Sequence, residues 1–544
     1  MPAIIARADW ATVGDPSRLF LDYIASPGEG LPTFIGGVSS NGTFWERALA
    51  GGESAGRERD GAAWERVVDS VASLSLRLGT QKAVVDKLRK AGTGDTAFVI
   101  TGQQPGTLGG PLHTVYKAAT AVALASFLEG VIGRPVVPLY WCGSDDTDFG
   151  EIRQLRMLTD TYDPVSAAIA QSAHRSGMPV GDISLSPLTT LWHVVRGFTD
   201  RFDHGAYVAA RVGAALEAAE DHGESAAAIL VGFFNGALAV VDGRMGCVRK
   251  CAQSVLSDYA REEEEVNQLV RREGERLEHG GYHAQITPGG DSGVFLLEGG
   301  LRKSVSAENR GLLLAAIEND IEKCSPGVVA RNLVQDHVFR PLAVVLGPAE
   351  LAYRAQIGAL YDKFGVPRPV ELPRMGATFL PPPLAALAAD RGEVSGLVEN
   401  PVAYAKTVYQ RSVPSDLVAA VAELKTGLSD LLERFAERAL GDLPEKSQQK
   451  IRARLGELED RQEKLAQTAA GAGKVMALEQ WPFLGHIQQL IKPDGKPQER
   501  WLAGLFPFLY SGDGTGDRLV VLARTHVDEL MDGHAQHIVY SCGP

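Results

Sequence analysis

The 544-residue sequence is poor in cysteine and has no long apolar run. Five scattered thiols, an odd number, are typical of reduced cysteines in the cytosol and exclude a simple disulfide framework. The longest apolar stretch, 118–128, is about half of what a bilayer span requires. No charged segment followed by an apolar one opens the chain, so we expect a cytoplasmic protein with no membrane partner.

An excess of basic charge is also missing. The chain has 54 Lys and Arg against 67 Asp and Glu, a net charge of −13. Because nucleic-acid phosphates bind basic faces, we expect no nucleic-acid partner. The P-loop and H-E-x-x-H motifs are absent as well. Neither the Cys247–Cys251 pair nor the C-terminal histidines match a closed metal motif, so no metal site is predicted.

The bulk composition is that of a globular protein. Apolar residues make up 45% of the chain and charged residues 22%. At this length the chain exceeds one ordinary domain and should bury roughly 75% or more of its unfolded surface.

The most informative segment is 98–127, where a strand, a glycine-rich loop and a helix follow one another. An apolar run ends in Thr101-Gly-Gln-Gln-Pro-Gly106, and Pro111 stands where a helix begins. Proline suits the first helical position because its missing N–H has no partner there. Glycines in such a loop let backbone N–H groups approach an anion. We therefore predict ligand contacts at Gly102, Gly106 and Gly110.

Three carboxylates follow the next strand. The run 136–141 closes a β-α-β unit and leads into Asp145, Asp146 and Asp148. Ligands of parallel sheets bind at the carboxyl ends of strands, so these carboxylates and the glycine loop are expected to share a pocket. Clustered carboxylates repel one another, which raises at least one pKa unless a cation intervenes. Such a cluster suits a general base, an ammonium site, a Mg²⁺ site or a solvated turn.

Neighbouring polar residues extend this candidate pocket. Gln103 and Gln104 suit recognition of polar groups on a sugar or nucleotide, or else face solvent in a turn. His113 lies in the first helical turn, where the helix dipole lowers the pKa of an imidazole and favours an anion. Lys117 shares its helix face. Trp141 either floors the pocket or belongs to the core.

A second α/β pattern follows the helical middle of the chain. A buried-strand run, 341–346, leads into Gly347-Pro-Ala-Glu350, a helix to about 364 and a further run, 369–373. Glu350 and either Tyr353 or Arg354 can share a helix face. Together with Gly347 they are binding candidates, and so is Arg374. The recurrence predicts an α/β protein with one Rossmann-like sheet interrupted by a large insertion.

Near residue 415 the pattern changes to an a/d seam. Apolar residues at 417, 421, 424, 428, 431 and 435 alternate spacings of four and three, and a second series runs over 451–465. Two antiparallel helices fit this pattern, either as a protruding coiled-coil hairpin used for dimerisation or as a pair packed on its own core. The predicted division is 1–164 and 326–412 for the core, 165–325 for a mostly helical insertion, 413–492 for the hairpin and 493–544 for a segment returning to the core.

These motifs resemble those of the BshC family, the enzymes that are expected to add cysteine in bacillithiol biosynthesis. The likeness rests on Thr101–Gly106, Gly110-Pro-Leu-His-Thr-Val-Tyr-Lys117 and 141–152, then on 334–336, 347–356, 364–366, 373–374 and 537–540. It covers nearly the whole chain. One departure is Thr147, which stands where the family loop Glu-Asp-His-Asp typically has its histidine. If that histidine acts as a base or a ligand in the family, this chain must do without it or use His113 in its place.

The resemblance implies a Rossmann-like core with helical connecting-peptide insertions and a C-terminal α-helical coiled-coil hairpin that forms a homodimer. It also implies that cysteine is added to the amine of glucosaminyl-malate. A free carboxylate is a poor electrophile, so activation as an adenylate or acyl phosphate is expected, with ATP, with or without Mg²⁺, as the cofactor.

The resemblance also suggests roles for the candidate residues. Asp146 or Asp148 would take the proton of the amine, with His113 as a further catalytic candidate. The glycine loop, the helix N-terminus and Lys117 would hold phosphates, and Arg354 or Arg374 would bind the malyl carboxylates. Two alternatives stay open: a related ATP-dependent amide ligase or nucleotidyltransferase with another amine, and a non-catalytic dimeric scaffold or ligand sensor.

Overall fold

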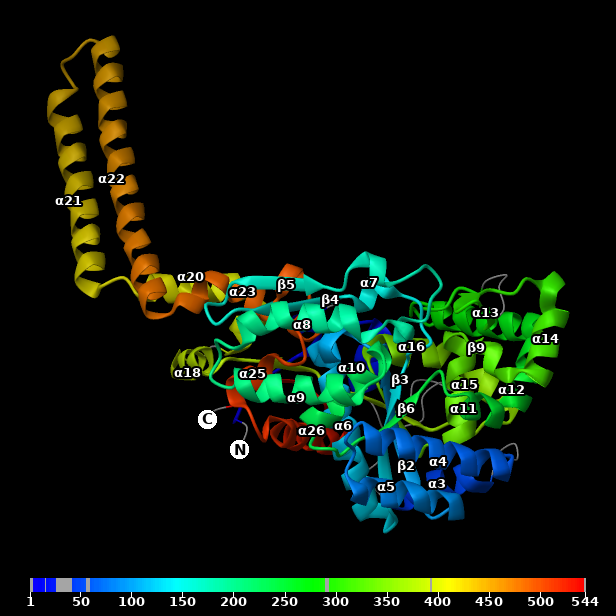
Figure 1. Ribbon diagram of the computed structural model, residues 1–544. Helices are drawn as coiled ribbons and strands as arrows, with labels where there is room; N and C mark the ends of the chain where they lie inside the picture. The colour runs from blue at the N-terminus through cyan, green and yellow to red at the C-terminus, as the bar shows by residue number, and fades with distance from the viewer. Residues whose placement is uncertain are drawn as a thin grey trace. The chain divides into compact units, whose positions relative to one another are not determined.

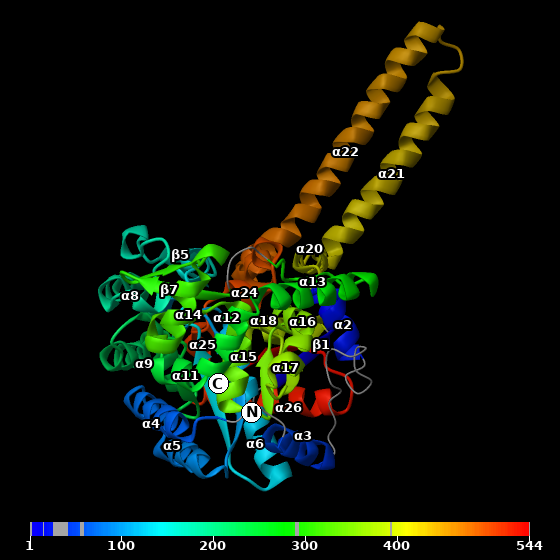
Figure 2. The same cartoon turned by 90° about the vertical axis from the view of Figure 1, so that its right-hand side faces the viewer.

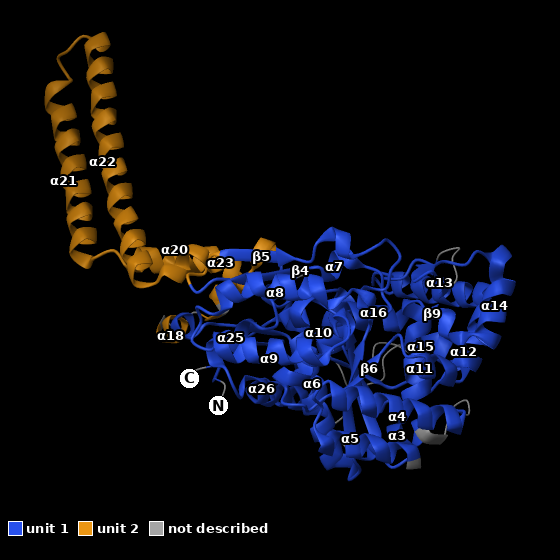
Figure 3. Ribbon diagram, in the orientation of Figure 1, with its two compact units in different colours: residues 1–160, 164–385, 496–544 blue, residues 161–163, 386–495 orange. Residues whose placement is uncertain are grey.

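The computed structural model describes residues 3–14, 16–25, 42–54, 59–288, 293–391 and 394–542. The chain divides into two units, shown in Figure 3. The first comprises 1–160, 164–385 and 496–544, and the second 161–163 and 386–495. Figures 1 and 2 trace the elements from two directions.

A parallel five-stranded sheet forms the centre of the first unit, counted over the described residues. Its order is β11-β10-β2-β3-β6, and every neighbouring pair is parallel. The strands are β2 (Ala97–Gln103), β3 (Val136–Cys142), β6 (Ala239–Asp242), β10 (Ala343–Leu346) and β11 (Val370–Pro373). Strands from both sides of the helical middle pair directly, which confirms the Rossmann-like sheet predicted from the sequence. The insertion also contributes β6 to the sheet edge, which the helical interpretation of 165–325 did not include.

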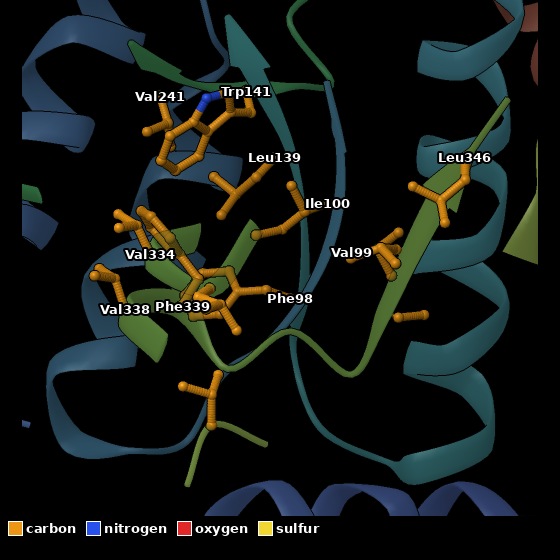
Figure 4. Packing of buried hydrophobic residues seen from close by; sticks show 14 of the residues in the cluster. Phe98, Val99, Ile100, Leu139, Trp141, Val241, Val334, Val338, Phe339 and Leu346 are labelled. Carbon is orange, nitrogen blue, oxygen red and sulfur yellow. The ribbon is translucent and has the colours of Figure 1, made fainter. Parts of the chain in front are cut away.

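Both faces of this sheet are buried. Every residue of β3 is buried, as expected where helices cover a parallel sheet on both sides. In Figure 4, Phe98, Leu139 and Trp141 gather with side chains of α15 (Val328–Phe339), whereas Val99 points to the other side. Strand residues 98 and 99 face opposite sides because side chains alternate along a strand. The close packing holds the carboxyl ends of β2, β3 and β10 in fixed positions.

Helix α6 (Leu112–Ile132) covers one face of the sheet. It packs against β2, β3 and β10 and against α26 (Thr515–Met531). Among the described residues it is the one helix long and apolar enough to cross a membrane, but most of its apolar stretch is buried inside the fold. We therefore interpret α6 as a core helix, longer than the apolar run visible in the sequence.

The rest of the first unit surrounds this core. Its N-terminal helices are α1 (Trp10–Val13), α2 (Arg18–Ala25), α3 (Gly42–Ser54), α4 (Gly61–Arg77) and α5 (Lys82–Arg89). The later helices are α7 (Phe149–Ile152), α8 (Leu185–Thr199), α9 (Gly205–Ala218), α10 (His222–Phe233), α11 (Gly246–Cys251), α12 (Gln253–Arg261), α13 (Glu263–His279), α14 (Arg310–Asn319), α16 (Pro348–Gln356), α17 (Gly358–Phe364), α24 (Gln498–Trp501) and α25 (Phe506–Ser511).

Smaller sheets complete this unit. The hairpin β4 (Gln154–Leu158) and β5 (Pro164–Ala168) follows α7, and β7 (Val294–Glu298) pairs with β8 (Leu301–Lys303) and β9 (Cys324–Pro326). Near the chain ends, β13 (His537–Ser541) lies between β1 (Ala3–Ala8) and β12 (Ala377–Phe379). The C-terminal segment thus belongs to the same unit as the central sheet.

The second unit is helical. Helix α18 (Pro382–Arg391) enters it, followed by α19 (Val394–Glu399), α20 (Pro401–Arg411), α21 (Ser415–Ala439), α22 (Glu445–Gln480) and α23 (Ile487–Ile491). Helices α21 and α22 are the two long helices predicted from the a/d seam. Within one chain the pair does not bury that seam, because Leu424, Leu431 and Phe435 remain 46%, 58% and 48% exposed.

Candidate functional site

A pocket of about 290 Å³ opens at the carboxyl ends of β2 and β3 and is closed by α15 and α16. This volume is close to the lower end of small-molecule sites. Half of the predicted site residues line it: Gly102, Gln103, Gln104, Trp141, Asp146, Glu350, Tyr353 and Arg354. The first loop and the carboxylate loop therefore meet at one pocket, although Asp146 is the one of the three aspartates that lines it. The helix after the second Gly-Pro turn lines it as well.

The three aspartates after β3 have different environments. Asp145 is buried, with Oδ1 3.2 Å from Nη2 of Arg331. Asp146 lines the pocket, and its Oδ1 accepts hydrogen bonds from the backbone N–H groups of Thr147 and Asp148. Asp148 is exposed and caps α7 by accepting from the N–H of Glu151. Asp146 and Asp148 therefore accept hydrogen bonds from the backbone of their own loop and of the helix that follows it.

A cation balances two of these carboxylates. Burial alone would raise the pKa of Asp146, but the Arg331 guanidinium, Gln104 and the two backbone donors together hold that pKa below its usual value. Nη1 of Arg331 lies 3.6 Å from Oδ2 of Asp146. Asp146 is therefore a permanently ionised group rather than one poised to exchange a proton near neutral pH.

Sequence reasoning missed Arg331. It projects from α15, some 185 residues after the aspartates, and only the fold brings it to them. The sequence does carry a signal, since the polar residues Arg331, Asn332 and Gln335 stand at intervals of one and three on this helix, and all three line the pocket. A polar stripe on a buried helix marks a face turned toward something polar.

Several buried polar atoms of the pocket have no protein partner within the described part of the chain. Nε of Arg331 and Nε1 of Trp141 are donors without an acceptor, and Oε1 of Gln104 is an acceptor without a donor. Leaving a buried polar group unpaired costs about 1–3 kcal/mol. Such atoms in one pocket are what a bound polar molecule would satisfy. Trp141 meets both sequence expectations, because its ring also packs against Phe339 in the core.

Lys117 lies behind the pocket rather than in it. Its Nζ donates to the Gly102 carbonyl at 2.7 Å and to Oε1 of Gln103 at 2.8 Å, and it pairs with Glu350 at 2.5 Å. Burial lowers the pKa of Lys117 and the Glu350 carboxylate opposes that shift. Glu350 in turn accepts from the N–H of Gly347. This network joins the two loops and leaves the ammonium with three acceptors.

The glycine loop differs from the anion cradle predicted for it. Gly106 and Gly110 pack backbone against backbone, since a Cβ on Gly106 would lie 2.4 Å from the Gly110 Cα. At the start of α6, the N–H of Leu112 donates to the carbonyl of Leu502, and the Gly110 carbonyl accepts from Gly504. The helix N-terminus is thus covered by the segment 502–504. Of these glycines, Gly102 is the one that lines the pocket.

His113 contacts the chain just before this covering segment. Its Nδ1 donates to the carbonyl of Glu499 at 3.2 Å. Burial, then the nearby Arg374 and Lys117, lower the pKa of His113 to about 3. The imidazole is neutral at physiological pH, and the described pocket lining does not include it.

Both arginines that the sequence offered to substrate carboxylates are paired inside the protein. Arg354 is buried, donates from Nε to Glu371 at 2.8 Å and pairs with Asp336. Arg374 holds the two carboxylate oxygens of Glu499 at 2.9 and 2.6 Å. Among the described pocket residues, the guanidinium whose Nε–H has no hydrogen-bond acceptor is instead that of Arg331.

The Arg374–Glu499 pair should make stability depend on pH. Burial would raise the pKa of Glu499, but Arg374 outweighs it and lowers that pKa to about 2. A lowered folded-state pKa stabilises the protein above the unfolded value and loses that contribution as pH falls through about 4.5 to 2. We predict that Glu499→Gln lowers the free energy of unfolding by about 3 kcal/mol at pH 7.

The measurement is urea denaturation of the wild type and the variant at pH 7 and pH 3. The difference should shrink at pH 3, where the wild type loses part of the same contribution. The exposed Glu459→Gln serves as the control and should change little at either pH. A difference for Glu499→Gln that is equal at both pH values would contradict the assigned pairing.

Comparison with known proteins gives the same result for a family model and for individual relatives. Residues 8–375 match the family model described as "Bacillithiol biosynthesis BshC, N-terminal Rossmann-like domain". A protein of Koribacter versatilis named "Putative cysteine ligase BshC" is 26% identical over 541 residues, which cover 95% of this chain and 97% of the relative. A protein of the same name from Solibacter usitatus is 28% identical over 80% of this chain and 84% of the relative.

Proposed function

The chain belongs to the BshC family, and on that premise we propose that it joins the carboxyl group of L-cysteine to the amine of glucosaminyl-malate, completing bacillithiol in the cytosol. The names of the relatives support a cysteine ligase. The observation that carries the proposal is the pocket, where two donors and one acceptor without partners among the described residues occur together with carboxylates.

The pocket chemistry suits a molecule with both carboxylate and amine groups. The Nε–H of Arg331 and the indole N–H of Trp141 are donors that a carboxylate oxygen can accept from. Oε1 of Gln104 can accept from an ammonium or hydroxyl group. The acidic side chains Asp146 and Glu151, both lining residues, favour a cationic amine by charge. Glucosaminyl-malate carries all of these groups.

A nucleoside triphosphate is the ordinary activator of a carboxyl group, but the residues predicted to hold its phosphates have other partners. The start of α6 is covered by 502–504. Lys117 already has three acceptors. We therefore assign no step of the reaction to nucleotide contacts made by these residues.

The test is direct product formation. Purified protein is incubated with cysteine labelled with ¹⁸O in its carboxyl group, glucosaminyl-malate, ATP and Mg²⁺. Mass spectrometry should find bacillithiol, with one ¹⁸O atom transferred to the released phosphate or AMP. Product only with a different amine would contradict the substrate, and no amide product with any amine would contradict ligase activity.

We also propose that the exposed seam of α21 and α22 joins two chains. Leu424 and Leu431 lie on this seam and are largely exposed within one chain. Light scattering should give twice the 58.1 kDa chain mass for the wild type. Replacing both leucines with aspartate should weaken dimerisation by about a hundredfold, since it puts charge into a buried apolar interface.

Leu312→Asp, at another exposed leucine outside the seam, is the matched control. It should leave the mass unchanged. A monomeric wild type at micromolar concentration, or a double variant that dimerises as well as the wild type, would contradict dimerisation through the seam.

A further inference from the structure

Glu151 is a pocket residue to which the sequence assigned no role. It lies in the short helix α7, just after the aspartate loop, and it lines the pocket together with Asp146 and Glu350. The three carboxylates differ in what holds them. That difference decides which of them is available to a substrate.

Two of the three carboxylates already have partners within the protein. Asp146 accepts two backbone N–H groups and lies beside the guanidinium of Arg331. Glu350 accepts the N–H of Gly347 and pairs with Lys117. A carboxylate held by a cation and by backbone donors is stabilised in its ionised form and is a weak base.

The carboxylate of Glu151 has no such partner. No group in the described ranges hydrogen-bonds or ion-pairs with it, and its backbone N–H is used by Asp148 to begin α7. Although the residue as a whole is exposed, its carboxylate is partly withdrawn from water at the pocket edge.

The electrostatic surroundings act in the same direction as this geometry. Withdrawal from water, then the charges of Asp148 and Asp146, raise the pKa of Glu151, and Lys117 and Arg500 oppose the shift only in part. A raised pKa strengthens a carboxylate as a base and brings it closer to working pH.

We propose that the Glu151 carboxylate is the base that takes the proton from the substrate's ammonium group in this pocket. The inference rests on the proposed function, which supplies the amine. An N–H bond of the ammonium breaks, an O–H bond forms on Glu151, and the electron pair stays on nitrogen. The step leaves a neutral amine with a free lone pair, which is the form of the amine that can act as a nucleophile. Asp146 and Arg331 orient the substrate beside it.

The test uses the full-length gene in a bacillithiol-producing bacterium whose own copy is deleted. Plasmids carry the wild type, Glu151→Gln, Glu151→Asp, Asp148→Asn or the exposed-surface control Glu275→Gln. Mass spectrometry follows bacillithiol and glucosaminyl-malate. Loss of a general base costs about 10²–10⁴-fold in rate. We expect Glu151→Gln to leave bacillithiol at the level of the empty plasmid. Glu151→Asp keeps a carboxylate and should restore at least tenfold more bacillithiol than Glu151→Gln.

Binding separates a base from a binding group. Calorimetry with glucosaminyl-malate should give Glu151→Gln a Kd within about fivefold of the wild type, because a partly exposed charge pair contributes little to affinity. A much larger loss of binding would overturn the role of base. Full restoration of bacillithiol by Glu151→Gln, or a loss of bacillithiol confined to Asp148→Asn, would also overturn the role of base. Either result would leave the proposed function standing. If the wild type itself fails to restore the thiol, both the proposed function and this inference fall.

Discussion

Replacing Arg331 with methionine is expected to abolish product formation and to lower the free energy of unfolding by about 3–5 kcal/mol. Arg331 pairs with Asp145, which is 1% exposed, and with Asp146 at the pocket wall. Removing the guanidinium takes away the ion pair of the buried Asp145. Only the more distant guanidinium groups of Arg249 and Arg302 then balance that charge. The substitution also removes a pocket-lining side chain whose Nε–H has no acceptor in the described part of the chain.

A second variant separates these two effects. In the double variant Asp145→Asn with Arg331→Met, the buried charge and its partner are both absent, so about half or more of the lost stability should return. Product formation should stay lost, because the substrate contact is still missing. Arg271→Met, at an exposed position on α13, is the control and should be close to the wild type.

Urea denaturation and the product assay together make the measurement. A stable and active Arg331→Met variant would contradict both roles. Recovery of activity in the double variant would show that Arg331 acts only through the stability of the loop.

The second large effect concerns Arg354. Its guanidinium is buried between Asp336 and Glu371, both of which are buried, and Tyr361 adds a hydroxyl contact. Burial alone would raise the pKa of Glu371, but Arg368 and Arg354 hold that pKa below its usual value. Arg354→Met should therefore cost about 3–5 kcal/mol of unfolding free energy at pH 7.

This prediction also decides between two roles for Arg354. If its guanidinium binds a substrate carboxylate, as the sequence suggested, the variant should fold normally and show a raised KM. If it is the internal cation seen in the structure, the variant should be destabilised and any folded fraction should keep its KM. Arg454→Met, in an exposed pair on α22, is the matched control, with an expected change below about 1 kcal/mol.

The sheet was predictable because each strand has an apolar run that is visible in a short stretch of sequence. The runs that became β2, β3 and β10 are apolar at nearly every position, as buried parallel strands are. The long helices α21 and α22 were visible for the same reason, through spacings of three and four. Strand β6 was missed because it lies within an alanine-rich region that was interpreted as mostly helical.

The site was predictable only in part. Gln104, Trp141 and Asp146 could be found because they end strands or follow them. The pairing of Arg374 with Glu499 could not be found, because the two residues are 125 positions apart and only the fold brings them together. Arg331 was likewise hidden. Sequence spacing indicates which residues can share a helix face, but it does not show which charges the fold neutralises.

The most direct test of the central claim is thiol and precursor profiling by mass spectrometry in a strain that lacks this gene. The account predicts loss of bacillithiol with accumulation of glucosaminyl-malate, which would place the protein at the addition of cysteine even if the purified enzyme proved inert. An unchanged bacillithiol pool in a genome with no second copy of the gene would contradict it.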